Sequence, residues 1–253
     1  RGPVQVNLPL NLSFGTPDYK YRALFPNDED LLSGHFADPA GASVISAEAW
    51  SRLCETALRL KANTIQAGTV SYPDETSVAV ATRRGLVVTA SHFNLLGSNT
   101  YRWPLELSAL PNQGWDWVKD PQSMAHMWRA SIDAQKDAEV LWSVGLRGVT
   151  DSDYTACGKD LRLCAEITNQ VVGNMTAWVR EVQGPDAPII WYLFGGASEL
   201  MAAGLLSPPT GVTFLASDNY PHIGMINQIQ LNETGGVYYH AAWMSNIESS
   251  PVS

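Results

Sequence analysis

The sequence predicts an α/β fold, a (β/α)8 TIM-like barrel, on three observations. Short β-rich runs alternate with polar or glycine-rich breaks and with longer stretches of 3.6-residue spacing, an order typical of βα units. Residues 188–194 are apolar on both faces, as in a parallel strand covered by helices. No Gly-x-Gly-x-x-Gly motif follows the first strand, which favours a barrel over a nucleotide-binding doubly wound sheet.

The strands expected in chain order are residues 19–25, 64–69, 86–90, 140–146, 189–194, 212–216 and 237–240. Helices are expected at residues 46–62, where Ser46 can act as N-cap, and at 123–138, 161–181 and 198–205. The sequence pattern indicates only seven inner strands. The barrel is therefore either closed by the alternating run 4–12 or incomplete at its last strand.

The length and composition fit one globular domain. Barrels of about 253 residues are ordinary single domains, and a chain with 45% hydrophobic and 16% charged residues can bury a large core. We divide the chain into an N-terminal arm or extra strand, residues 1–18, and a barrel domain, residues 19–253. Residues 99–121 lack helical spacing and are expected to form a long loop that carries Trp103, Trp115 and Trp117.

The charge of the chain argues against several classes of partner. Its formal net charge is −9 and it has no basic run, so nucleic acids and anionic membranes are not expected partners. No apolar run reaches the ~18 residues that a membrane span needs. No His or Cys spacing suggests a metal site, and we expect no cofactor. Neutral polysaccharides or oligosaccharides, and cationic groups, remain as partners.

The cysteines and glycosylation sequons predict a secreted protein. Cys157 and Cys164 are close enough in sequence to close a small disulfide loop, whereas Cys54 lies within a helical pattern and is expected to be a buried thiol. Three acceptor sequons predict glycosylation at Asn11, Asn174 and Asn232. Together these features favour an oxidising, extracellular location.

Polar side chains follow five of the expected strands, where barrels of this class place their sites. Each has a structural alternative: the acidic residues can be turn or capping residues, the histidines can be core residues, and Arg147 can be an ion-pair partner. Among the aromatics, Trp50, Trp128 and Trp178 are expected in the core, while ligand contact is open for Trp103, Trp115, Trp117 and Trp243. The five strand ends carry Asp28 and Glu29; His92; Arg147, Asp151 and Asp153; Asp218 and Asn219; Tyr239 and His240.

These segments resemble the central barrel domain of glycoside hydrolase family 115, the xylan α-1,2-glucuronidases. Residues 21–29 (YRALFPNDE) and 58–63 (LRLKAN) resemble family motifs, as do Ser91-His92 and residues 145–148 (GLRG) with Asp151. Residues 191–194 (WYLF) with Glu199-Leu200, 218–220 (DNY) and 236–240 (GVYYH) follow in the family's order. The resemblance implies a barrel and an inverting hydrolysis of glucuronic acid side chains.

The departures from the family fall on polar positions. Gly195-Gly196 stands where the family has Lys-Glu, which removes a carboxylate that the family uses in catalysis. Phe93, Asn94, Ser217 and Ala242 also differ from the family pattern. A non-catalytic carbohydrate-binding or structural relative, or a fragment of a larger enzyme, therefore stands as the alternative to a hydrolase.

Glycoside hydrolysis requires two placed carboxyl groups, one that donates a proton and one that activates water or attacks carbon. We predict that Asp28 and Asp151 are catalytic. A homo-oligomer or the remaining domains of a longer chain are the expected protein partners. The residues predicted to hold sugar hydroxyls or the uronate carboxylate are Glu29, His92, Arg147, Asp218, Asn219, Tyr239 and His240.

Overall fold

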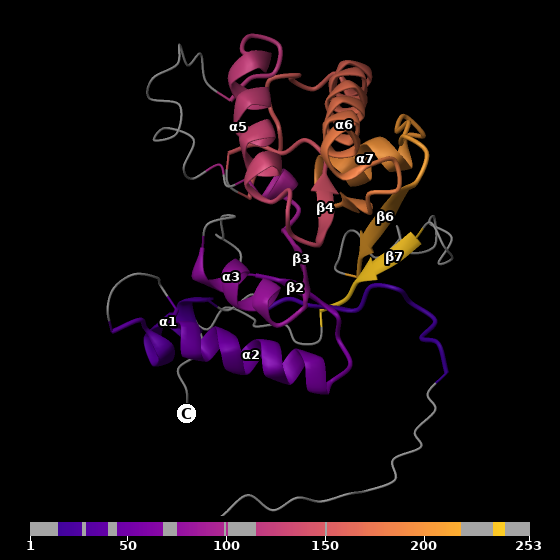
Figure 1. Ribbon diagram of the computed structural model, residues 1–253. Coiled ribbons are helices and arrows are strands. Elements are labelled where there is room, and N and C mark those ends of the chain that lie inside the picture. The colour runs from indigo at the N-terminus through magenta and orange to yellow at the C-terminus, as the bar shows by residue number, and fades with distance from the viewer. Residues whose placement is uncertain are drawn as a thin grey trace, which may run out of the picture.

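In a computed structural model of the chain, seven parallel strands form one sheet in the order β1-β2-β3-β4-β5-β6-β7 (Figure 1). The structure describes residues 15–26, 29–39, 45–67, 75–98, 100, 115–149, 151–218 and 235–240. The strands are β1 (Ala23–Leu24), β2 (Thr64–Gln66), β3 (Val87–Thr89), β4 (Val140–Val144), β5 (Ile189–Leu193), β6 (Val212–Ser217) and β7 (Gly235–Tyr238).

The strand order agrees with a barrel and differs from a doubly wound sheet, whose order reverses at a switch point. Every neighbouring pair is parallel, for example Trp142 beside Ile189 and Ile190 beside Thr213. The described sheet is a seven-stranded half-barrel, consistent with an incomplete TIM-like barrel. A closed eight-stranded barrel is not confirmed, because the run 4–12 lies outside the described residues. The domain boundary at residue 18 also stays a prediction.

All seven expected strands are present, with shifted ends. The first strand is shortened most, from the expected residues 19–25 to Ala23–Leu24. The Arg22 N–H donates to the Asn63 side chain at 2.8 Å, so it does not extend the backbone hydrogen bonds between β1 and β2. The last strand ends at Tyr238, two residues earlier than expected, so His240 follows the strand. Strand positions were readable because the buried runs are strongly apolar, whereas their ends depend on neighbouring segments.

The helices are α1 (Glu29–Phe36), α2 (Ala47–Arg59), α3 (Thr76–Arg83), η1 (Leu95–Gly97), α5 (Pro121–Ala134), α6 (Leu161–Gln183) and α7 (Gly196–Ala202). Short side chains cap three of them: Ser46 accepts from the Ala49 N–H, Asp120 from Ser123 and Asp160 from Leu163. The four expected helices are confirmed with shifted bounds. The helical spacing in the sequence did not indicate α1, α3 or η1.

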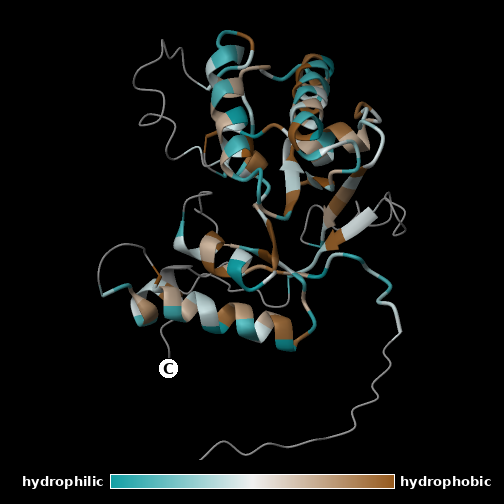
Figure 2. Ribbon diagram, in the orientation of Figure 1, coloured by the Kyte–Doolittle hydropathy of each residue, from teal (hydrophilic) through white to brown (hydrophobic). Residues whose placement is uncertain are grey.

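Alternate strand residues pack into two apolar layers. One buried cluster joins Val88, Trp142 and Trp191 to the helices. Figure 2 shows hydrophilic and hydrophobic positions on α2, α5 and α6, as expected of helices with one buried side. A smaller cluster holds Tyr192, with Tyr21 before β1 and Tyr238 in β7 packed against it. Because segments beside the first and last strands meet there, this cluster marks the concave face of the sheet.

The tryptophans expected in the core are confirmed for Trp50 and Trp128, which are 4% and 0% exposed. Trp178 is half-buried against the same cluster. Trp115 and Trp117, for which ligand contact was open, pack against Trp128 with ring centroids 5.6 and 5.9 Å from it. Trp115 and Trp117 therefore pack in the hydrophobic core around Trp128. Trp103 and Trp243 lie outside the described residues.

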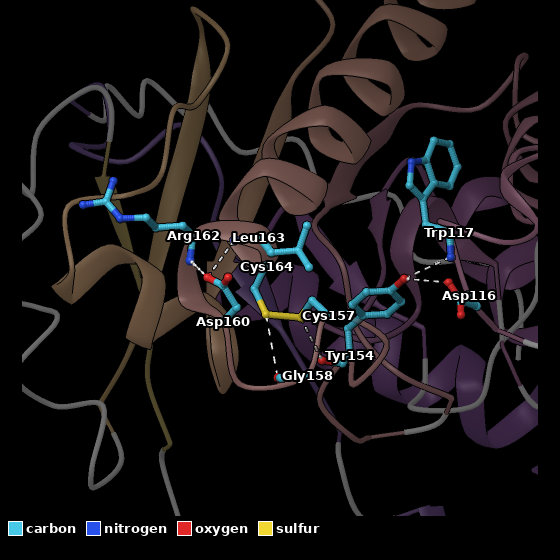
Figure 3. The surroundings of a disulfide bond; sticks show 9 residues. All are labelled: Asp116, Trp117, Tyr154, Cys157, Gly158, Asp160, Arg162, Leu163 and Cys164. Atoms are coloured by element: carbon cyan, nitrogen blue, oxygen red, sulfur yellow. Dashed lines mark hydrogen bonds between the residues drawn. A yellow bond between two sulfur atoms is a disulfide. The ribbon is translucent and has the colours of Figure 1, made fainter.

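The expected disulfide joins Cys157 to Cys164, with a Cα–Cα distance of 5.1 Å. Figure 3 shows the bond beside the first turn of α6, where Asp160 caps the helix, and Tyr154 pointing towards Asp116 and Trp117. Cys54 is fully buried, and burial raises the pKa of its thiol. It is therefore an unreactive core residue, as expected.

Replacing both Cys157 and Cys164 by serine should lower the free energy of unfolding by about 2 kcal/mol, since a bridge across a short loop restricts the unfolded chain. Urea unfolding of the double variant against the wild type measures the change. An unchanged midpoint would contradict the prediction and would indicate that the Asp160 cap and Tyr154 contacts hold this loop without the bridge.

Within the described part of the chain, no helix combines the length with the apolar character that crossing a bilayer requires.

Candidate functional site

Polar residues from β3 to β7 gather at the carboxyl ends of the strands in two groups. The first, the Arg147 cluster, consists of His92, Arg147, Asp151 and Asp153, which follow β3 and β4. The second is the Asp218–His240 pair, which follows β6 and β7. Parallel strands bring their carboxyl ends to one edge of the sheet, so residues distant in sequence meet there.

In the Arg147 cluster, one guanidinium holds two carboxylates. Arg147 Nη2 lies 2.9 Å from Asp151 Oδ1, and Nη1 donates to Asp153 Oδ1. The same Asp151 oxygen lies 2.7 Å from His92 Nε2. The Arg147 side chain is only 8% exposed, whereas those of Asp151 and Asp153 are more than half exposed. The cluster therefore presents two anchored carboxylates to solvent above a buried cation.

These contacts keep Asp151 ionised. The hydrogen bond from His92 is the largest cause that lowers the pKa of Asp151, and the charges of His92 and Arg147 add to it against the opposing effect of burial. A carboxyl whose folded pKa is depressed stabilises the fold above its unfolded pKa, and that contribution is lost as pH falls through the folded value. At neutral pH, the Asp151 side chain is therefore a carboxylate.

The backbone of Gly195 and Gly196 approaches this ion pair closely. The Gly196 N–H, at the start of α7, donates to Asp153 Oδ1 at 2.9 Å. Gly195 has φ 57°, and a Cβ there would lie 2.1 Å from Arg147 Nη1 and 2.3 Å from Asp153 Oδ1. Position 195 therefore requires glycine, because its φ is positive and because a Cβ would overlap the Arg147–Asp153 ion pair.

Gly195→Ala should destabilise the protein by about 1–3 kcal/mol beyond the cost of the positive φ alone, because Arg147 and Asp153 must move. Gly204→Ala is the matched control, since Gly204 has φ 68° and open space around its Cβ position. Urea unfolding of the two variants gives the difference. Equal losses of unfolding free energy in the two variants would show that Arg147 and Asp153 can move away from the new Cβ at no cost.

Aromatic rings surround His92 on the concave face. Its ring centroid lies 4.4 Å from that of Phe194 and 6.2 Å from that of Tyr192. The Arg147 guanidinium lies 5.5 Å from the centre of the Phe194 ring. The Tyr192 hydroxyl donates to the Ala90 carbonyl at 3.2 Å, which connects β5 to the segment that carries His92. These contacts hold the imidazole and guanidinium in fixed positions.

In the Asp218–His240 pair, one carboxylate receives two hydrogen bonds from one histidine. His240 Nδ1 lies 2.5 Å from Asp218 Oδ1, and the His240 backbone N–H donates to Oδ2 at 3.1 Å. Both side chains are less than one-fifth exposed. The backbone bond from Asp218 N to Tyr238 O extends the pairing of β6 with β7 and sets the two residues side by side.

Tyr238 lies between the two groups and was missed by the sequence analysis. Its ring lies 4.7 Å from His240 and 6.0 Å from Tyr192. Burial raises the pKa of Tyr238 to about 12, and the charges of Asp151 and Asp218 contribute to that rise. The alternation of side chains along a strand could have indicated Tyr238. Neighbouring strand residues point to opposite faces, so the exposed Tyr239 implies that Tyr238, which pairs with Ser217, points to the other face.

The predicted site residues fall into three sets. The structure brings together His92, Arg147 and Asp151, and separately Asp218 and His240, while Tyr239 is 72% exposed. Arg147 is an ion-pair partner, one of the two roles expected from its sequence position, and its direct contact with a sugar stays a prediction. Glu29 begins α1, but its side chain is outside the described part, as are Asp28 and Asn219. Their roles also stay predictions.

Of the glycosylation sites, only Asn174 lies within the described residues. It sits inside α6, and Thr176 of the same sequon is 1% exposed. An acceptor sequon normally lies in a surface loop, so these surroundings do not favour glycosylation of the folded chain at Asn174. Asn11 and Asn232 lie outside the described residues. Among the described residues, no group of three or more His, Cys, Asp or Glu side chains is arranged to hold a metal ion.

Comparisons with known proteins agree with the motif resemblance. The model of glycosyl hydrolase family 115 matches residues 14–251. No curated protein sequence matches the chain. One similar solved structure is described as a family 115 4-O-methyl-α-glucuronidase with specificity for decorated arabinogalactans, with TM-score 0.75 and 21% identity. At this identity the likeness concerns the fold. It covers 91% of this chain and 32% of that one, so the chain spans about a third of its relative's length.

Proposed function

The chain belongs to glycosyl hydrolase family 115, and from this premise we propose that it hydrolyses glucuronic acid side chains of xylan or a related polysaccharide. The observation that carries the proposal is the contact of His92 and Arg147 with one oxygen of Asp151, at the edge of the sheet where barrels place their sites. Because the chain spans a third of its structural relative, we further propose that other domains of a longer chain complete the enzyme.

In this proposal Asp151 is the general base. Its ionised carboxylate takes a proton from water, the water oxygen bonds to the anomeric carbon of the uronic acid, and the glycosidic carbon–oxygen bond breaks. His92 and Arg147 fix the carboxylate, which limits the orientations that the attacking water can take. The leaving oxygen must receive a proton from a second group. Asp28 is the residue predicted for that step.

The proposed sugar contacts come from the rest of the site. His92, Asp218 and His240 lie at the strand ends on the concave side, and Glu29, Asn219 and Tyr239 are the further predicted contacts. Arg147 points both terminal nitrogens at carboxylates of its own chain. It therefore acts on the substrate chiefly by positioning Asp151.

Incubation with 4-O-methylglucuronoxylan and with aldouronic oligosaccharides tests the proposal. We expect release of the uronic acid, measured by chromatography. No release at high protein loading, while binding to the same oligosaccharides is still measurable by calorimetry, would rule out the hydrolase.

A carbohydrate-binding relative without turnover is the second candidate function. It is favoured by the pairing of both Asp151 and Asp153 with one guanidinium, and by the absence of a side chain at Gly196. In such a protein the two carboxylates would accept hydrogen bonds from sugar hydroxyls. Binding without release in the assay above is the result expected of this candidate.

We also propose that the protein is secreted. The Cys157–Cys164 bond supports this, since disulfides persist in oxidising compartments. The mass of the intact protein from its natural source, before and after enzymatic removal of N-glycans, tests it. A mass shift would support secretion with glycans at Asn11 or Asn232, whereas reduced cysteines and no shift would contradict it.

A further inference from the structure

We propose that Tyr154 is a positioning residue for Asp151, because its hydroxyl and the Trp115 indole hold the two ends of the loop that carries this carboxylate. We call the described residues between Arg147 and Tyr154 the Asp151 loop. The inference rests on the proposed function for the reaction that Asp151 serves. The two holds are contacts within the chain, so they can be tested with and without substrate.

The Asp151 loop is closed on itself. The Gly148 N–H donates to the Ser152 carbonyl at 2.8 Å, and the Ser152 hydroxyl donates to the Val149 carbonyl at 2.7 Å. A Cβ at Gly148 would lie 2.4 Å from Ser152 Oγ and 2.6 Å from the Asp153 carbonyl oxygen, so the loop packs tightly against its own start. The positions of its two ends therefore set the direction of Asp151.

The Trp115 side chain holds the first end of the loop. Its Nε1 donates to the Arg147 carbonyl at 2.7 Å, and its ring packs against that of Trp128 with centroids 5.6 Å apart. The Trp128 side chain is fully buried in α5. The Arg147 main chain is therefore anchored, through Trp115, to the core packing of α5.

The Tyr154 hydroxyl holds the second end of the loop. It accepts a hydrogen bond from the Trp117 N–H at 3.0 Å and donates to Asp116 Oδ1 at 3.5 Å. Figure 3 shows this hydroxyl directed at Asp116 and Trp117, on the side of the ring away from the disulfide. Further along the chain, Cys157 is bonded to Cys164 in the first turn of α6. The chain that leaves the loop is therefore held at Tyr154 and again at Cys157.

Both holds come from one short segment, residues 115–117, which precedes α5. Asp116 Oδ1 also accepts from the N–H groups of Val118 and Lys119, at 2.9 and 3.2 Å, so this segment is folded into a turn of its own. The two carboxylates of the loop, by contrast, are more than half exposed. Their positions therefore depend on how the ends of the loop are held.

The electrostatic contacts of Asp151 depend on where the loop lies. The hydrogen bond from His92 and the charges of His92 and Arg147 lower the pKa of Asp151. Two further titratable groups face this cluster: Asp153, on the same guanidinium, and Tyr238, whose pKa is raised by burial and by the Asp151 charge. A displaced loop would weaken the contacts with His92 and Arg147, so the pKa of Asp151 would rise towards its ordinary value.

Tyr154→Phe tests the second hold without changing a charge. Burial raises the pKa of the Tyr154 phenol, so the variant removes two hydrogen bonds from a group that is neutral at neutral pH. We expect the midpoint of the Asp151 carboxyl titration to rise, measured by NMR on protein isotopically labelled at the aspartate carboxyl carbons. The Asp151 signal is identified by its absence in Asp151→Asn.

On aldouronic oligosaccharides, Tyr154→Phe should lower kcat by roughly 10–100-fold with little change in KM, because a small displacement of the general base misaligns the attacking water. The acidic limb of the kcat/KM profile should move to higher pH, because a base with a raised pKa is already protonated there.

Asn169→Ala is the matched control. Asn169 Nδ2 donates to the Leu205 carbonyl and its Oδ1 accepts from the Ser207 N–H, both at 2.9 Å, so this variant also loses two hydrogen bonds to a loop. That loop precedes β6 and lies at the amino end of the strand, away from the site. We expect a lower urea midpoint, as for Tyr154→Phe, with the Asp151 titration unchanged.

Trp115→Phe removes the first hold and should raise the pKa of Asp151 in the same direction, so a folded sample of either variant tests the inference. An unchanged Asp151 titration in the folded variants would overturn it. That result would show that the contact of Asp153 with the Gly196 N–H holds the loop instead.

A rise in Asn169→Ala as large as in Tyr154→Phe would also overturn the positioning role, because lost stability alone would then move Asp151. If the wild type releases no uronic acid, the proposed function fails, while the titration still decides whether Tyr154 positions Asp151.

Discussion

Asp151→Asn is expected to lower turnover of aldouronic oligosaccharides by roughly 10²–10⁴-fold, the range typical of a lost general base. Asparagine keeps the shape of the side chain and can still accept a hydrogen bond from His92 or Arg147, but it cannot take a proton from water. Single-turnover rates measure the change, and urea unfolding shows whether the variant is folded.

Asp153→Asn is the matched control, because Asp153 shares Arg147 with Asp151 but contacts the Gly196 N–H instead of His92. We expect its rate to stay within about tenfold of the wild type. Equal losses in both variants would indicate that Arg147 needs both carboxylates and that neither acts as the base. Full turnover in Asp151→Asn would refute the proposed role of Asp151.

The sequence predicted the positions of the strands because each strand is a short apolar run followed by a polar break. Runs such as β5 are buried on both faces, and this burial leaves a pattern that does not depend on neighbours. The helices α1 and α3 were missed because they are eight residues each and contain few positions of strong helical spacing. Their formation depends on tertiary packing, which a local pattern does not report.

The site was predictable in its position and only partly in its pairings. His92 and Asp151 were both expected at strand ends, but they are 59 positions apart in the chain. No spacing rule indicates that His92 and Arg147 contact the same oxygen of Asp151. Tyr238 was missed because Tyr238 and Tyr239 are adjacent tyrosines in the expected strand 237–240, and the local pattern does not distinguish them. Only the register of β6 with β7 shows which of the two faces the site.

The largest loss of stability is expected for Trp128→Ala, about 3–5 kcal/mol. The Trp128 side chain is fully buried in α5 and contacts the rings of Trp115 and Trp117. Its removal leaves a cavity beside the rings of Trp115 and Trp117, and the surrounding helices can close it only in part. Urea unfolding measures the change in free energy.

Trp178→Ala is the control, because Trp178 is only half-buried and lies 5.6 Å from the Arg129 guanidinium. A loss of about 1 kcal/mol is expected there. The two variants should also differ in activity, since Trp115 Nε1 donates to the Arg147 carbonyl at 2.7 Å and Trp128 packs beneath Trp115. If Trp128→Ala unfolds at the same urea concentration as Trp178→Ala, the predicted difference in stability is wrong. If the two variants have the same activity, these rings do not support Arg147, and the position of the ion pair depends on the Gly195–Gly196 backbone instead.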